Sequence, residues 1–117
     1  MTTKSAAPVN EVHLVGRVSG EPAVRSLPSG DELVQFRVVV PRPQRRGDGG
    51  RAGTRAQVDT IDVACWTGRV RRTAARLPDG QGVEVSGSLR RRFFATATGR
   101  GSRYEVDAAS VRRVLLE

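Results

Sequence analysis

The segment "VDTIDVACWTGRVRRTAARLPDGQGVEVSG", residues 58–87, changes its hydrophobic period twice. Residues 58–66 alternate apolar and polar side chains, which predicts a strand that is buried on one face. In residues 67–80 the apolar side chains recur at i, i+4 and i+7, the spacing of a short amphipathic helix, and a proline and a glycine end the pattern. Alternation then returns from residue 82. One short helix therefore lies between two strands, and this order restricts the possible folds.

Alternating segments continue on both sides of this stretch. Residues 11–17 and 33–41 predict two earlier strands. The strand that begins at residue 82 continues to residue 97, and residues 104–116 predict a last strand after a turn at residues 98–103. Three strands, a helix and two strands predict an all-β OB-fold, which is a five-stranded Greek-key barrel with one short helix between strands three and four. A small β-sandwich is the alternative, but it leaves the helix without a place.

A length of 117 residues suits one domain. Residues 1–9 lack an apolar run and predict a flexible tail, so the OB-fold domain is expected to span residues 10–117. Residues 42–56 are rich in arginine and glycine and contain no large apolar side chain, which predicts a long mobile loop. This loop is either a basic arm for phosphates or a flexible surface insertion.

Basic residues exceed acidic ones by 20 to 12, which gives a formal net charge of +8. So large an excess in a small domain indicates a polyanionic partner. A membrane partner is not expected, because the chain has no membrane-length apolar stretch and no long basic amphipathic helix. The single cysteine and the absence of a signal-peptide pattern favour the cytoplasm, in association with the nucleoid.

The sequence argues against an enzyme. His13 is the only histidine and Cys65 the only cysteine, too few for a zinc site or a nucleophile–base pair. We interpret His13 as a residue on a strand face and Cys65 as a small core residue. No glycine-rich phosphate loop precedes a helix, so we expect no cofactor, no metal and a binding function.

The stretch "GSLRRRFF", residues 87–94, combines three arginines with two phenylalanines. Because side chains alternate along a strand, Phe93 is predicted in the core, and Phe94 is predicted on the outer face beside Arg90 and Arg92. The same alternation places Trp66 on an outer face.

Exposed rings among arginines suit single-stranded nucleic acid, because bases stack on the rings while the cations follow the phosphates. Stacking is indifferent to base identity, which favours binding without sequence preference. Three other interpretations remain open: Trp66 covered by the helix, Phe94 in a subunit contact, and the arginines on a merely solvated face.

The chain resembles bacterial single-stranded DNA-binding proteins from residue 10 to residue 114. "NEVHLVGRVSGEPAVR" resembles the opening of that family, and "PSGDELVQFRVVV" and "TIDVACW" are similar to its second and third strands. "GVEVSGSLRRRFF" is similar to the family's G-x-x-V-x-V-x-G-x-L strand, which ends in basic residues and an aromatic.

The resemblance places Trp66 and Phe94 on stacking positions of the family. It departs from the family at Pro41 and Thr60, where a further aromatic is common, and at Asp62, where a basic or polar residue is common. The candidate nucleic-acid-binding residues are Trp66, Phe94, Arg25, Arg37, Arg42, Arg45, Arg46, Arg69, Arg90 and Arg92.

The resemblance implies binding of single-stranded DNA in replication, recombination or repair, and a homo-oligomer. A tetramer is expected, with a dimer as the alternative, and Val15 and Val39 are predicted to point outward toward partner subunits. The sequence ends in "VRRVLLE" without the family's acidic tail, so recruitment of replication and repair enzymes is not expected. An RNA-binding OB domain and a primosome-like accessory or scaffold protein are the alternative functions.

Overall fold

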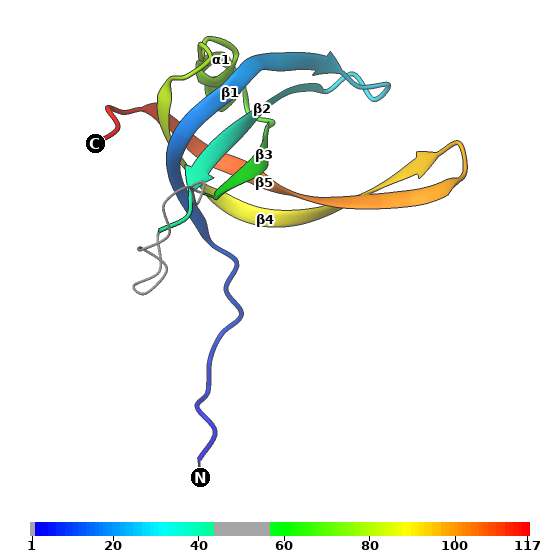
Figure 1. The fold of residues 1–117 in the computed structure, drawn as a ribbon. Helices are drawn as coiled ribbons and strands as arrows, with labels where there is room; N and C mark the ends of the chain where they lie inside the picture. The colour runs from blue at the N-terminus through cyan, green and yellow to red at the C-terminus, as the bar shows by residue number, and fades with distance from the viewer. Residues whose placement is uncertain (1, 44–56) are drawn as a thin grey trace.

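A computed structural model describes residues 2–43 and 57–117 as a closed barrel with one helix (Figure 1). Its elements are β1 (Val12–Ser26), β2 (Glu32–Pro41), β3 (Val58–Cys65), α1 (Gly68–Ala75), β4 (Gly82–Thr96) and β5 (Gly99–Arg113). The strands follow the order β1-β2-β3-β5-β4, in which β3 and β5 pair in parallel and the other neighbours antiparallel. The predicted five-stranded OB-fold with a helix between β3 and β4 is thereby confirmed.

Valine dominates the interior of the barrel, since its branched side chain fits the pleated surface of a strand. The buried core residues on the strands are Val18, Val34, Phe36, Val38, Val63, Cys65, Val83, Val85, Val106, Ala108 and Val111. Helix α1 contributes Val70 and Ala74 to this core, and Leu77 follows just after it. These three residues occupy the face that the helical spacing predicts.

The barrel closes where β1 changes its partner. The first part of β1 pairs with β4 as far as Arg17, and the remainder pairs with β2. A Cβ atom at Gly16 would lie 2.3 Å from the carbonyl oxygen of Val39, so glycine allows the close approach of β1 and β2. The predicted end of this strand at residue 17 is wrong. Pairing with β2 shifts its register between Ser19 and Ala23 and then continues to Ser26.

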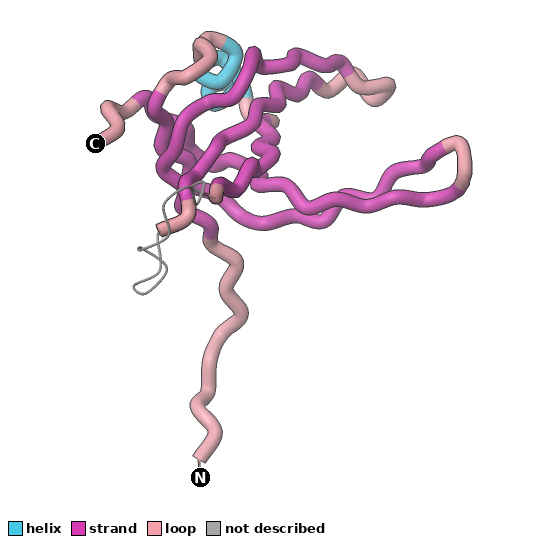
Figure 2. Tube along the Cα trace, viewed as in Figure 1, coloured by secondary structure: helices cyan, strands magenta, loops and turns pink. Residues whose placement is uncertain are grey.

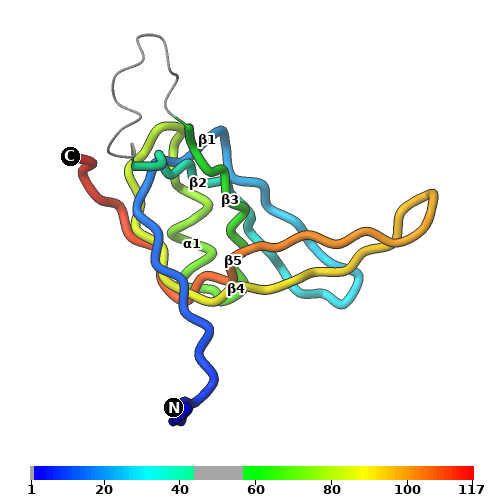
Figure 3. The backbone as a smooth tube through the Cα atoms, turned by 60° about the horizontal axis from the view of Figure 1, so that its bottom comes forward, coloured from blue at the N-terminus to red at the C-terminus, as the bar shows by residue number. Residues whose placement is uncertain are grey.

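Two hairpins, β1–β2 and β4–β5, project from the same side of the barrel (Figures 1 and 3). Strands β4 and β5 remain paired up to Thr96 and Gly99, whereas β1 pairs with β4 only as far as Gly87. The outer half of the β4–β5 hairpin is therefore a two-stranded ribbon. Its turn is shorter than predicted, with residues 97 and 98 between the strands (Figure 2).

The ribbon explains why the predicted orientation of Phe93 is wrong. Phe93 has the alternation of a core residue but is 71% exposed, and Leu89 is 43% exposed. Both residues lie where β4 leaves the barrel. The strand face that is buried at Val83 and Val85 is therefore exposed to solvent at these later positions. Val15 is exposed as predicted. Val39, predicted to point outward, is buried where β1 approaches β2 at Gly16.

Candidate nucleic-acid interface

The outer surface of β2, β3, β5 and β4 carries most of the charged and aromatic residues of interest. Register places Arg37 opposite Asp62, and Arg92 opposite Arg103. We call this surface the Trp66 face. Its residues are Arg37, Asp62, Trp66, Arg90, Arg92, Phe94, Arg103, Glu105 and Asp107.

Trp66 directly follows β3 and is half-buried. Its Nε1 donates a hydrogen bond of 3.3 Å to Oδ1 of Asp107 on β5. The Cζ atom of Arg92 lies 4.9 Å from the centroid of the indole ring, a cation–π distance. The ring is thus held by β5 and capped on one face by a guanidinium group, and it is not sealed under α1.

Arg92 is fixed by two carboxylates. Its Nη2 donates to Oδ1 of Asp107 at 2.9 Å, and its Nε donates to Oε1 of Glu105. Glu105 is 2% exposed, and its Oε2 has no hydrogen-bond partner among the described residues. Arg90 also pairs with Asp107, at 3.4 Å. The two predicted arginines of β4 therefore meet in one network with Trp66, but carboxylates already offset their charge.

Phe94 lies farther out on the same face and is 43% exposed. It stands opposite Gly101 of β5, and a Cβ atom there would come within 2.6 Å of the ring. The ring therefore packs against the backbone of Gly101, which has no side chain to displace it. Arg103 lies 5.8 Å from the ring centroid. No carboxylate of the described residues pairs with Arg103, which makes it the free cation beside this ring.

The two predicted arginines from the β2 region occupy different places. Arg37 lies on the Trp66 face, where it donates to Asp62 at 3.3 Å. Arg42 pairs with Asp59 at 2.8 Å, near the start of β3 and so at the opposite end of that strand from Trp66. The hydrogen bond from Arg42 lowers the pKa of Asp59. The structure brings Arg37, but not Arg42, to the Trp66 face.

The remaining predicted residues are dispersed. Arg25 is exposed on the β1–β2 hairpin opposite Leu33, and Arg69 is exposed at the start of α1. Arg45 and Arg46, with most of the predicted basic loop, lie outside the described residues. A hollow beside Trp66 is lined by Gly30, Asp31, Glu32, Trp66 and Arg71.

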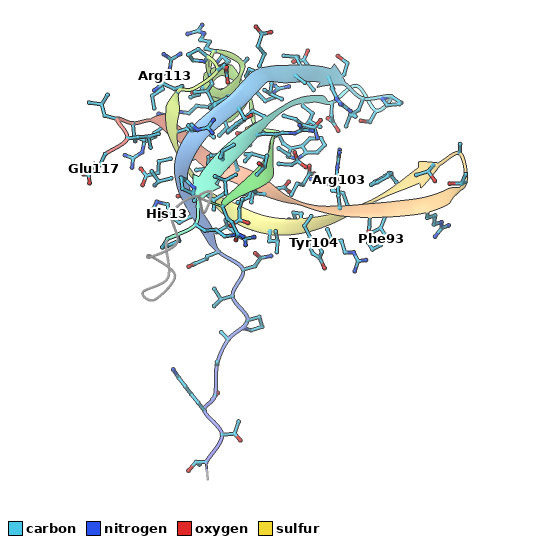
Figure 4. All side chains as sticks on the ribbon, viewed as in Figure 1. His13, Phe93, Arg103, Tyr104, Arg113 and Glu117 are labelled. Carbon is cyan, nitrogen blue, oxygen red and sulfur yellow. The ribbon has the colours of Figure 1, made fainter. Side chains whose placement is uncertain are left out.

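Sequence reasoning missed four residues of the hairpin: Arg91, Phe93, Arg103 and Tyr104. The run "RRRFF" places cations and rings on both parities of β4, and this signal could have indicated that both faces of the strand meet solvent. In Figure 4, Arg103 points to one side of the hairpin, whereas Phe93 and Tyr104 point to the other.

The cysteine and the histidine singled out by the sequence lie in the core and on an exposed strand face, respectively. Cys65 is fully buried, and burial, followed by the nearby charge of Asp107, raises the pKa of its thiol to about 12. His13 is an exposed strand residue, as predicted, and contacts Glu84. Within residues 2–43 and 57–117, no cluster of three His, Cys, Asp or Glu side chains could hold a metal ion. Over the same residues, no helix is long and apolar enough to cross a membrane.

Comparison with known proteins agrees with this fold. The family model described as "Single-strand binding protein family" matches residues 9–114. The chain therefore belongs to the single-strand binding protein family. It is 29% identical over 92 residues to the single-stranded DNA-binding proteins of Oceanobacillus iheyensis and Halalkalibacterium halodurans. Each alignment covers 79% of this chain, and the chain spans about half the length of these curated relatives, 54% and 52% respectively.

The fold is also similar to a solved structure, a Plasmodium falciparum SSB complex with ssDNA. The TM-score is 0.71 at 23% sequence identity, and the match covers 100% of both chains. This similarity supports the assignment of the barrel.

Proposed function

We propose that this protein binds single-stranded DNA without sequence preference and protects it during replication, recombination or repair. Its activity is binding and not catalysis. One observation carries the proposal: two aromatic rings, Trp66 and Phe94, share an outer face with several arginines, in a chain of the single-strand binding protein family. Bases would stack on the rings, and phosphates would contact the guanidinium groups.

The two rings have different surroundings in the free protein. Phe94 offers 43% of its surface, with Arg103 beside it. Trp66 is already capped by Arg92, so a base would stack on the free part of the indole or on the guanidinium plane. We therefore assign Phe94 and Arg103 as the first contacts and Trp66 with Arg92 as a more rigid platform.

Trp66 is the only tryptophan, so its fluorescence reports on this face alone. Titration with poly-dT should quench it, while duplex DNA at the same concentration should not. In a salt series, the logarithmic slope of affinity should approach about −0.7 per phosphate neutralised. Equal response to single-stranded and duplex DNA would overturn the proposal. Matched RNA and DNA oligonucleotides in competition test the RNA-binding alternative.

Phe94→Ala keeps the Trp66 signal and should weaken poly-dT binding by roughly 1–3 kcal/mol, as expected for the loss of one stacking ring. Phe94→Leu is the matched control, because it retains an apolar side chain but removes the aromatic face. Stacking predicts that leucine does not restore affinity. Restoration by leucine would show that the position provides only apolar contact.

We further propose that the protein acts in the cytoplasm as a homo-oligomer, with a tetramer expected and a dimer as the alternative. In the described residues, the first part of β1 pairs with β4 on one side only, and Val15 on this segment is 43% exposed. Open strand edges and exposed apolar residues are common subunit contacts. Light scattering should give a multiple of the 12.6 kDa chain mass, and a monomer at micromolar concentration would contradict the proposal.

A further inference from the structure

The β4–β5 hairpin has a second exposed face, opposite the Trp66 face. It consists of Leu89, Arg91 and Phe93 on β4 with Ser102 and Tyr104 on β5, and we call it the Tyr104 face. Phe93 is 71% exposed and Tyr104 is 59% exposed. Both rings point away from Arg103 (Figure 4).

Arg91 joins the two rings of this face into one platform. Its Cζ atom lies 5.1 Å from the centroid of Phe93 and 5.5 Å from that of Tyr104. Its Nη2 and Nε donate to Oγ of Ser102 at 3.1 and 3.3 Å. The guanidinium group is thus held over two rings by cation–π contacts and by hydrogen bonds to a hydroxyl group. Because the hydroxyl group is neutral, it does not offset the positive charge of Arg91.

The charge of Arg91 distinguishes this face from its counterpart. Arg90 and Arg92 pair with Asp107 or Glu105, whereas no carboxylate in the described part of the chain lies within ion-pair distance of Arg91. The Tyr104 face itself contains no acidic residue. Two exposed rings and an uncompensated cation are complementary to a ligand with planar aromatic groups and negative charge.

Burial in the core does not account for these rings. They lie on the part of the hairpin beyond the barrel, where β4 pairs with β5 alone. A two-stranded ribbon is marginally stable by itself, and cross-strand contacts of this kind add only a little stability. An exposed aromatic patch rimmed by polar groups indicates a binding surface.

We propose that the Tyr104 face is a second contact surface for the same DNA strand, used after the Trp66 face is filled. This inference rests on the proposed function. The free edge of β4 would let the DNA strand pass from one face of the hairpin to the other. The side chain of Asn10 donates to the carbonyl oxygen of Leu89 and accepts from its N–H. Beyond Leu89, no strand of the described residues pairs with this edge. A strand of DNA can therefore cross the edge from Phe94 to Phe93.

The double variant Phe93→Ala/Tyr104→Ala tests this with two lengths of oligo-dT. A short strand of about 8 nucleotides, within the range that one OB-fold binds, should quench Trp66 with less than about a twofold change in affinity. A strand of about 30 nucleotides should bind at least about fivefold more weakly than to the wild-type protein, and each protomer should occlude fewer nucleotides. Phe94→Ala, the matched variant on the other face, should weaken both lengths.

Arg91→Gln is a milder variant that keeps both rings. It should leave the salt slope for the short strand unchanged and reduce the slope for the long strand by about 0.7. Circular dichroism and urea unfolding would establish that each variant is folded.

Three outcomes would overturn the inference. Wild-type affinity and site size for the long strand, in folded variants, would show that the Tyr104 face does not contact DNA. A smaller oligomer by light scattering with unchanged DNA binding would assign the face to a second copy of the chain. Failure of the wild-type protein to bind either length would instead refute the proposed function, and this inference with it.

Discussion

The guanidinium carbon of Arg92 lies 4.9 Å from the centroid of the Trp66 ring, and the same guanidinium is bound to Asp107 and Glu105. One arginine therefore caps the candidate stacking ring and neutralises a buried carboxylate. Glu105 is 2% exposed whereas the Arg92 side chain is 39% exposed, so the same guanidinium group contacts a buried carboxylate and also reaches solvent.

Arg92→Ala should destabilise the protein by about 3–5 kcal/mol, because it leaves Glu105 as a buried charge without its partner. Urea unfolding measures the loss. Arg37→Ala is the control: its partner Asp62 is 40% exposed, so removal of this surface pair should cost about 0–1 kcal/mol.

The double variant Arg92→Ala/Glu105→Gln removes both charges and should recover a large part of the lost stability. If Arg92→Ala alone were as stable as the wild-type protein, Glu105 would not be buried against Arg92 in solution.

Gly101→Ala should weaken binding of single-stranded DNA while changing stability little. A Cβ atom at this position would lie 2.6 Å from the ring of Phe94, and the ring is the end of a side chain that can rotate away. Its displacement should reduce affinity for poly-dT by up to about 1–3 kcal/mol, as measured by Trp66 quenching. Gly99→Ala is not a suitable control, because Gly99 has a φ of 146°. Ser110→Ala is the better one, since Ser110 is exposed on β5 opposite Ser86 and belongs to neither face of the hairpin, and a similar loss there would contradict the role of Gly101.

Glu84 should make stability sensitive to acid. Hydrogen bonds from His13 and then from Arg112 lower the pKa of this carboxyl group in the folded protein. The unfolded chain therefore binds a proton at a higher pH than the folded protein does, and unfolding takes up protons between the two pKa values. The contribution of Glu84 is complete above the unfolded value of about 4.3 and is lost as the pH falls through the lowered folded value.

Urea midpoints measured from about pH 6 to about pH 3 check this dependence. The midpoint of the wild-type protein should fall more steeply than that of Glu84→Gln. Parallel curves for the two proteins would show that Glu84 makes no net interaction in the folded state.

Cys65 should resist alkylation in the native protein. Burial, followed by the charge of Asp107, raises the pKa of its thiol to about 12, so almost no thiolate is present at neutral pH. Iodoacetamide should label the thiol rapidly in denaturant and slowly without it, as read by mass spectrometry. Rapid labelling of the folded protein would indicate that the barrel opens beside β3.

The barrel was predictable because its signals are local. Alternation identified β2, β3 and the start of β4, and the change to helical spacing identified α1. Trp66 and Phe94 were also correctly placed outside the core. Phe93 was placed wrongly. Alternation shows which residues lie on the same face of a strand, but it does not show whether the barrel covers that face at a given position. The length of β4 beyond the barrel decides this, and it depends on where β1 stops pairing with β4.

The charges of the candidate site show a similar division. The sequence contains the arginines and the net charge of +8, but it does not reveal which cations are already paired. Asp107 and Glu105 lie 15 and 13 residues from Arg92 along the chain and reach it only across the β4–β5 register. Arg42, in contrast, is held at the far end of β3 by Asp59.

The sequence by itself determined the fold class, the family and the two rings of the outer face, because alternation, helical spacing and motif residues act over a few neighbouring positions. The tertiary structure alone decided that Arg92 caps Trp66, that Arg91 pairs with no carboxylate of residues 2–43 and 57–117, and that Phe93 and Tyr104 form a second exposed face. These relationships depend on strand register and on the point where the barrel ends, which are set by contacts between residues distant in the chain.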